Sequence, residues 1–106
     1  MRLVRKKFLE NLDLGKEYSI KKISDPEFII YAKREMNLLF AEAVTEKNPE
    51  KFADLIELIN SICEMLKIDF FECTKIRSDK RWKYGKFDCI LASRATMTDL
   101  GEESEN

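Results

Sequence analysis

Apolar residues recur at helical spacing through the middle of the chain. Between residues 26 and 46 they form a continuous stripe when the sequence is plotted at about 100° per residue. The stripe consists of Phe28, Ala32, Met36, Leu39 and Ala43. Ser24, with Pro26 two positions later, is typical of a helix start. The pattern therefore predicts a helix over residues 26–46, with Glu35 and Glu42 at one edge of its apolar stripe.

A second helix is predicted over residues 49–66, because Asn48 and Pro49 repeat the cap-and-proline signal. Its apolar arc is wider than one neighbouring helix could bury. The arc consists of Phe52, Leu55, Ile56, Leu58, Ile59, Ile62, Cys63, Met65 and Leu66. The short connection between the two helices predicts an antiparallel pair. The wide arc predicts contact with several helices, within one bundle or across a dimer interface.

A third helix is predicted over residues 70–84, between a capping Asp69 and a glycine stop at Gly85. Weakly alternating residues 17–23 and the apolar stretch 87–91 predict short extended segments. Together these elements predict an all-α fold, an antiparallel helix bundle with short extended segments near the N- and C-termini.

Composition supports this fold class and bounds the domain. The chain has 106 residues, of which 44% are apolar and 37% charged. Only three Gly and two Pro are present, which leaves little turn chemistry for an all-β fold. A single helical-bundle domain is expected over residues 1–92. The glutamate-rich end predicts a flexible acidic tail over residues 93–106.

The charge balance and the cysteine content indicate which cellular compartment and which binding partners to expect. The 19 Lys and Arg nearly cancel the 20 Asp and Glu, which argues against nucleic acid as a partner. No apolar run is long enough to span a membrane, and the basic N-terminus lacks the apolar segment of a signal peptide. Three cysteines without a CxxC pair suit a reducing compartment. We therefore expect a cytoplasmic protein with no membrane partner.

Histidine is absent, and this limits the chemistry that the chain can perform. A Ser-His-Asp triad and all His-containing zinc sites are excluded. No glycine-rich phosphate loop is present, because Gly15, Gly85 and Gly101 stand alone. Phosphate chemistry would therefore rely on carboxylate-bound Mg²⁺ together with Lys and Arg.

Three segments of the chain carry motifs in a recognisable order. Residues 3–7 read Leu-Val-Arg-Lys-Lys, and two acid-bearing helices joined near residues 48–50 follow them. Residues 76–81 and 85–87 read Ile-Arg-Ser-Asp-Lys-Arg and Gly-Lys-Phe. In this order the segments resemble the MazG-like and phosphoribosyl-ATP pyrophosphohydrolase-like family, with its Leu-Val-Arg-Asp-Lys start and Ile-Arg-x-x-Lys-x-x-x-x-Gly-Gly-Phe close. The resemblance covers about residues 1–92.

The resemblance implies a hydrolase that converts a nucleoside triphosphate to the monophosphate and pyrophosphate, with Mg²⁺ as cofactor. Acids three or four residues apart share a helix face, and two such faces supply the oxygen ligands that Mg²⁺ prefers. The implied metal ligands are Glu42, Asp54 and Glu57, supplemented by Glu35. The implied phosphate contacts are Arg5, Arg77, Lys80 and Arg81. A homodimer or homotetramer is expected.

Several acids of the family pattern are missing from this chain. Leu38 and Leu39 stand where the family has paired glutamates, and Lys6 and Asn60 also replace acids. Carbon cannot coordinate Mg²⁺. A second hypothesis is therefore a catalytically inactive family member that acts as a nucleotide-binding or protein-interaction module.

Each candidate residue also has a purely structural interpretation. Asp54 and Glu57 lie three residues apart on a polar helix face, where acids are commonly just solvated. Glu35 could form an ion pair with Arg5 or Arg77 at the edge of the bundle, because acids beside an apolar stripe need a partner. The basic residues near the end of the third predicted helix also suit its dipole. The sequence leaves both interpretations open.

Overall fold

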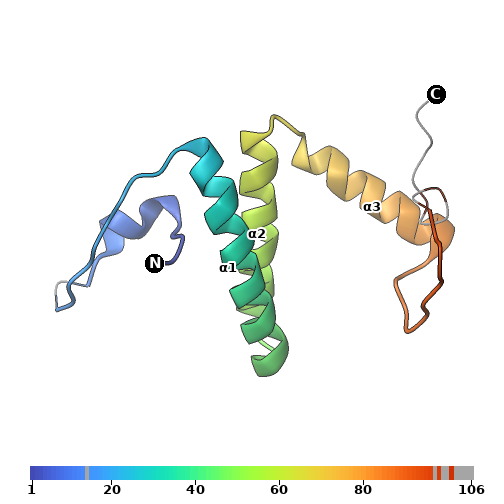
Figure 1. Ribbon diagram of the computed structural model, residues 1–106, viewed down its shortest axis with the longest axis horizontal. Coiled ribbons are helices and arrows are strands. Elements are labelled where there is room, and N and C mark those ends of the chain that lie inside the picture. The colour runs from blue at the N-terminus through green and yellow to red at the C-terminus, as the bar shows by residue number, and fades with distance from the viewer. Residues whose placement is uncertain (14, 97, 99–100, 102–106) are drawn as a thin grey trace. The chain divides into compact units, whose positions relative to one another are not determined.

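The computed structural model describes residues 1–13, 15–96, 98 and 101. Over this part of the chain all regular structure is helical. A 3₁₀ helix precedes three α-helices (Figure 1): η1 (Lys6–Asn11), α1 (Asp25–Glu46), α2 (Pro49–Met65) and α3 (Phe70–Tyr84). The predicted all-α class is confirmed, and the three predicted α-helices match the observed ones to within one residue at each end.

The chain divides into two compact units, residues 1–68 and residues 69–106, and each is described by itself. Residues 17–23 and 87–91, for which the sequence predicts extended segments, carry neither helix nor strand. The single domain expected over residues 1–92 stays a prediction. Within the predicted acidic tail, some positions lie outside the described part of the chain: 97, 99–100 and 102–106.

α1 begins where the sequence satisfies the free N–H groups of a helix start. The Glu27 N–H donates to Ser24 Oγ at 3.3 Å, and the Ser24 N–H donates to Glu27 Oε1 at 3.3 Å. This reciprocal pair is a capping box, and Pro26 fixes the backbone of the first turn. The helix ends at Glu46, and the left-handed backbone of the following Lys47 (φ 51°) redirects the chain into α2.

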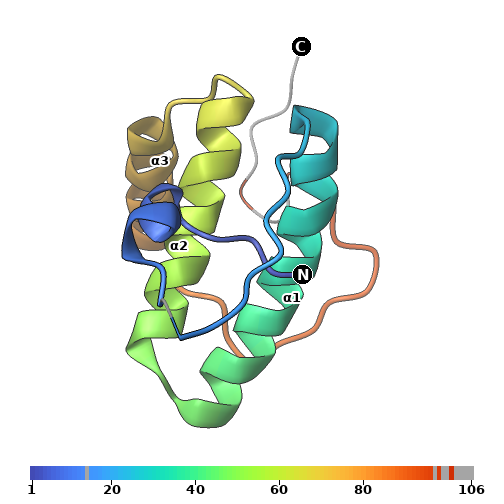
Figure 2. The same ribbon diagram turned by 90° about the vertical axis from the view of Figure 1, so that its left-hand side faces the viewer.

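α2 runs antiparallel to α1 and packs beside it (Figures 1 and 2). Asn48 caps it, because its side-chain oxygen accepts a hydrogen bond from the Glu50 N–H at 2.9 Å. The antiparallel pair predicted from the short connection is therefore confirmed. A small set of side chains in this unit is buried: Ala32, Glu35, Leu39, Ala43 and Cys63.

The N-terminal part of the first unit packs against this helix pair. Inside the N-terminal part, the ring of Phe8 meets the ring of Tyr18 edge to face, with centroids 5.3 Å apart. Residues 12 and 13 and residues 17–24 have no regular secondary structure. The polar contacts that attach this segment to α1 and α2 form the candidate site.

The second unit contains α3, whose two ends follow the sequence signals. Asp69 caps the helix by accepting a hydrogen bond from the Phe71 N–H at 2.9 Å. At the other end Gly85 has a positive φ of 84°, and its N–H donates to the Arg81 carbonyl oxygen at 2.9 Å. Across the described residues, no helix has the length and apolar character needed to cross a membrane.

Removal of the α1 cap should destabilise the protein. We expect Ser24→Ala to lower the free energy of unfolding by about 1 kcal/mol, because the Glu27 N–H loses its acceptor. Urea unfolding followed by circular dichroism measures the change. Ser24→Asp is the control, since Asp is an equally good cap residue. Equal losses in both variants would contradict a capping role.

Candidate functional site

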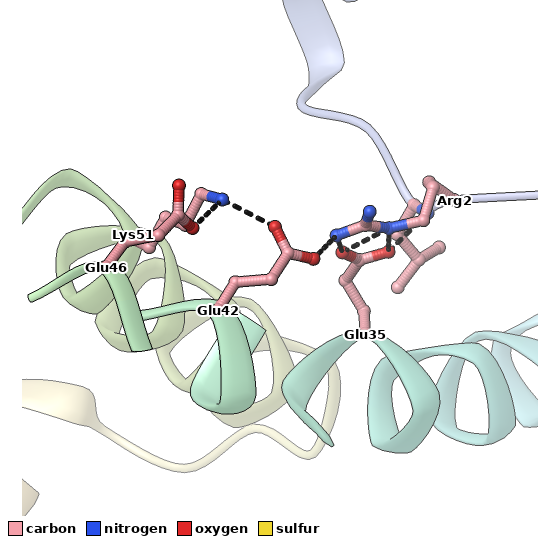
Figure 3. Close-up of polar contacts among 6 residues, drawn as sticks. Arg2, Glu35, Glu42, Glu46 and Lys51 are labelled. Carbon is pink, nitrogen blue, oxygen red and sulfur yellow. Dashed lines mark hydrogen bonds and ion pairs between the residues drawn. The ribbon is translucent and has the colours of Figure 1, made fainter. Parts of the chain in front are cut away.

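Glu35 is a buried carboxylate on α1, with 7% of its surface exposed. It shares a helix face with buried Ala32 and Leu39, so its charge needs a partner in this apolar setting. Arg2 is that partner (Figure 3): its Nε donates to Oε1 at 2.9 Å and to Oε2 at 2.8 Å. The Leu3 N–H also donates to Oε1, at 3.2 Å. The hydrogen bonds to Glu35 raise the pKa of the Arg2 guanidinium.

Glu42 extends the same network toward the end of α1. Its Oε1 lies 3.5 Å from Arg2 Nη2, and its Oε2 accepts a hydrogen bond from Lys51 Nζ at 2.5 Å. Lys51 on α2 also donates to Glu46, so one ammonium group bridges two α1 carboxylates (Figure 3). The hydrogen bond from Lys51, and then the charges of Lys51 and Arg2, lower the pKa of Glu42. The same contacts raise the pKa of Lys51.

A second arginine of the N-terminal segment contacts α2. Arg5 Nη2 donates to Asp54 Oδ1 at 2.6 Å, and these side chains are 61% and 43% exposed. The hydrogen bond to Asp54 raises the pKa of Arg5, and the charge of nearby Glu57 adds a smaller effect. Asp54 and Glu57 therefore share one face of α2, as their spacing predicts, and that face is turned to the N-terminal segment.

These contacts border a cleft of about 1150 Å³ within the first unit. Four of its lining residues are basic, namely Arg2, Arg5, Lys6 and Lys7. Four are acidic, namely Glu35, Asp54, Glu57 and Glu64. Its apolar lining includes Phe8, Phe28, Leu39 and Leu58. The cleft is large enough for a ligand of nucleotide size, and it combines charges of both signs with an apolar surface.

The structure brings together part of the predicted site. Three of the four acids named as metal ligands line the cleft, and the fourth, Glu42, is held by Arg2 and Lys51 instead. Among the predicted phosphate contacts, Arg5 lines the cleft. The other three lie on α3, in the second unit: Arg77, Lys80 and Arg81. These three share one helix face, as their spacing predicts.

The metal ligands implied by the family resemblance stay a prediction. Among the described residues, no three acidic or cysteine side chains are close enough together to share a metal ion. The carboxylate oxygens have the chemistry that Mg²⁺ prefers. In the observed arrangement, Glu35, Glu42 and Asp54 each accept a hydrogen bond from a cationic side chain of the protein itself.

The sequence did not single out the two cations that organise the site. Glu35 forms an ion pair, as the structural interpretation expected, but its partner is Arg2 and not Arg5 or Arg77. The sequence position of Lys51 could have indicated this contact. Lys51 lies in the first turn of α2, directly after the short connection from the acidic end of α1. No sequence pattern indicates the contact of Arg2 with Glu35, because it depends on the path of the irregular segment before α1.

Comparisons with known proteins add no further constraint on the site. The chain was compared with profiles of protein families, with characterised proteins and with solved structures, and none of them matches it.

The Glu42–Lys51 pair should make the free energy of unfolding depend on pH in acidic solution. The pKa of Glu42 in the folded protein lies below its ordinary 4.5. The stabilisation by the ion pair is therefore complete above pH 4.5 and is lost as pH falls through the folded pKa. We expect Glu42→Gln to lower the free energy of unfolding near neutral pH. The difference from the native protein should shrink below pH 4.5.

Urea unfolding at several pH values from about 7 to about 3 measures this difference. Glu17→Gln, at an exposed position of the irregular segment, is the matched control. A Glu42→Gln effect that stays the same size across this range would contradict the ion-pair origin.

Proposed function

We propose that the protein is a divergent MazG-like nucleoside triphosphate pyrophosphohydrolase, which releases pyrophosphate from a nucleoside triphosphate. One observation carries the proposal: acids from both α1 and α2 and the basic N-terminal segment line a single cleft of nucleotide size. A nucleotide bound with Mg²⁺ presents a cation and phosphate oxygens side by side. A cleft with neighbouring carboxylates and Lys or Arg groups suits both.

Each group of side chains has a role in this proposal. Mg²⁺ would take one or two oxygen ligands from the acids that the resemblance implies and the others from the phosphates of the nucleotide. These acids are Glu42, Asp54, Glu57 and Glu35. When bound, Mg²⁺ neutralises phosphate oxygens and acidifies an attacking water. Phosphate contacts would come from the basic lining of the cleft, Arg5, Lys6 and Lys7. Arg77, Lys80 and Arg81 on α3 are further candidates, because three cations on one helix face can receive a triphosphate.

A second candidate function is a non-catalytic nucleotide-binding or protein-interaction module. One observation favours it: Glu35, Glu42 and Asp54 already receive charge-assisted hydrogen bonds from side chains of the same protein. A carboxylate neutralised in this way has less to gain from a metal ion. The two candidates share the cleft and differ in whether Mg²⁺ joins the nucleotide there.

Pyrophosphate release tests the enzymatic proposal. The purified full chain is incubated with a panel of ribo- and deoxyribonucleoside triphosphates plus Mg²⁺ or Mn²⁺. We expect release that falls to the protein-free rate in the double variant Asp54→Ala/Glu57→Ala, because two oxygen ligands are removed from the cleft. The control is Glu17→Ala/Asp79→Ala, which removes two exposed acids outside the cleft lining. Native release no faster than that of the Asp54→Ala/Glu57→Ala protein would count against an enzyme.

Thermal unfolding with the same ligands separates the two candidates. A Mg²⁺-nucleotide site predicts that both ligands together raise Tm by more than the sum of their separate effects. The non-catalytic module predicts no such excess.

We also propose that the protein is a homo-oligomer, a dimer or a tetramer, assembled through α2. The support is the apolar arc of this helix, which remains partly exposed beyond its contact with α1. Phe52, Ile56 and Ile59 are 41%, 57% and 41% exposed. Clustered apolar side chains of this kind mark association surfaces, and an isologous contact would pair the same arc of two copies.

Sedimentation velocity tests this assembly. We expect the native protein to sediment as a dimer or tetramer and Ile56→Lys to sediment as a monomer, because a charge within the exposed part of the arc opposes its burial. Ile20→Lys, at an exposed position outside the helices, should leave the assembly intact. A monomeric native protein would rule out the proposal.

A further inference from the structure

α3 carries an excess of positive charge that the net charge of the whole chain does not reveal. Its acidic residues are Glu72 and Asp79. Its basic residues are more numerous: Lys75, Arg77, Lys80, Arg81 and Lys83. Four acids without a basic residue among them follow later in the sequence, at positions 99–105. The near-zero net charge, which argues against nucleic acid, is therefore an average over a basic helix and an acidic end of the sequence.

Large aromatic side chains of the second unit lie in solvent among these charges. Phe71, Trp82 and Phe87 are 81%, 92% and 95% exposed. Residues three or four positions apart share a helix face, and one face of α3, called the aromatic face below, consists of Phe71, Lys75, Ser78 and Trp82. Phe71 and Trp82 lie about 16 Å apart along the helix axis, at a rise of about 1.5 Å per residue. The aromatic face therefore presents two solvent-exposed rings with a cationic side chain between them.

Proteins bind single-stranded nucleic acid through exposed aromatic rings and cations that lie close together. Unpaired bases stack on the rings, and Lys and Arg neutralise the phosphates. We infer that the aromatic face of α3 binds single-stranded nucleic acid, either RNA or DNA. Phe71 and Trp82 stack on bases, and Lys75 and Lys83 contact the phosphates of the strand. The inference is independent of the proposed hydrolase, because it depends on α3 and makes no use of the cleft.

Two other kinds of partner fit the aromatic face less well. A helix that lies on a membrane surface has its apolar residues on one side and its charges on the other. The basic residues of α3 are spread around the helix, and Lys75 lies on the same face as the exposed rings. A helix that docks in a protein groove has apolar residues at successive turns, whereas Lys75 and Ser78 lie between Phe71 and Trp82. The mixture of rings and cations on one face favours a nucleic acid strand.

The fluorescence of Trp82 tests the inference on the native full chain. Trp82 is the only tryptophan of the sequence, so the tryptophan emission reports on this side chain alone. We expect oligothymidylate or oligouridylate to quench the emission, because a stacked base quenches an indole ring. Added NaCl should reverse the quenching, since phosphate contacts weaken steeply with salt. Quenching by either oligonucleotide supports the inference, and unchanged emission with both would overturn it.

Fluorescence anisotropy of a labelled oligothymidylate measures what the exposed ring contributes to binding. We expect Trp82→Ala to bind about tenfold more weakly than the native protein, because one stacked base is lost. The matched control is Phe40→Ala, which removes an aromatic ring of α1 that is 59% exposed. Circular dichroism should show that both variants keep their helices, since neither ring is buried. Equal affinities of Trp82→Ala and Phe40→Ala would overturn the inference.

The salt dependence of the same titration measures the phosphate contacts. We expect Lys75→Gln/Lys83→Gln to reduce the slope of log affinity against log salt concentration by about 1.4, because two phosphates of a single strand lose their cations. Lys16→Gln/Lys22→Gln, which removes two exposed positive charges before α1, should keep the native slope. Identical slopes in the two double variants would contradict the inference.

Two further ligands distinguish the alternative partners. Vesicles of phosphatidylserine and phosphatidylcholine that shift the Trp82 emission to shorter wavelength, without quenching by either oligonucleotide, would assign the aromatic face to a membrane surface and overturn the inference. Duplex DNA that binds as tightly as oligothymidylate would show that charge acts without base stacking and would also overturn it. Weaker binding of the duplex supports the inference, because paired bases cannot stack on the rings.

Discussion

The arrangement of the first unit depends on how the charge of Glu35 is neutralised inside the helix pair. A carboxylate with 7% exposure beside Ala32 and Leu39 is costly unless it is hydrogen-bonded and paired. Arg2 meets both requirements, and the Leu3 N–H adds a further donor. These contacts attach the start of the chain to α1, and the same residues line the cleft.

The same charges serve the fold and the proposed function. Alternating charges run without interruption from Glu46 through Lys51, Glu42 and Arg2 to Glu35, and they join α2, α1 and the N-terminal segment (Figure 3). Such pairs add little net stability, because the cost of removing the charges from water offsets their attraction.

Helix periodicity accounts for the positions of the acidic side chains in the candidate site, but not for Arg2 and Lys51, which pair with them. Asp54 and Glu57 share a face because residues three apart on a helix do so, and Glu35 and Glu42 border the apolar stripe for the same reason. Their partners come from other elements. Lys51 meets Glu42 because a short connection folds α2 back along α1, and Arg2 meets Glu35 along a path without regular structure.

The sequence by itself determined the helices, because their signals are local. Ser24, Asn48 and Asp69 cap helix starts within three residues of the N–H groups they accept from, and the apolar periodicity spans each helix. Tertiary structure alone decided that the buried carboxylate meets Arg2 across 33 positions, since no local pattern encodes a long-range contact made by an irregular segment. It also decided that cations of the chain neutralise the acids for which the motif implies a metal ion.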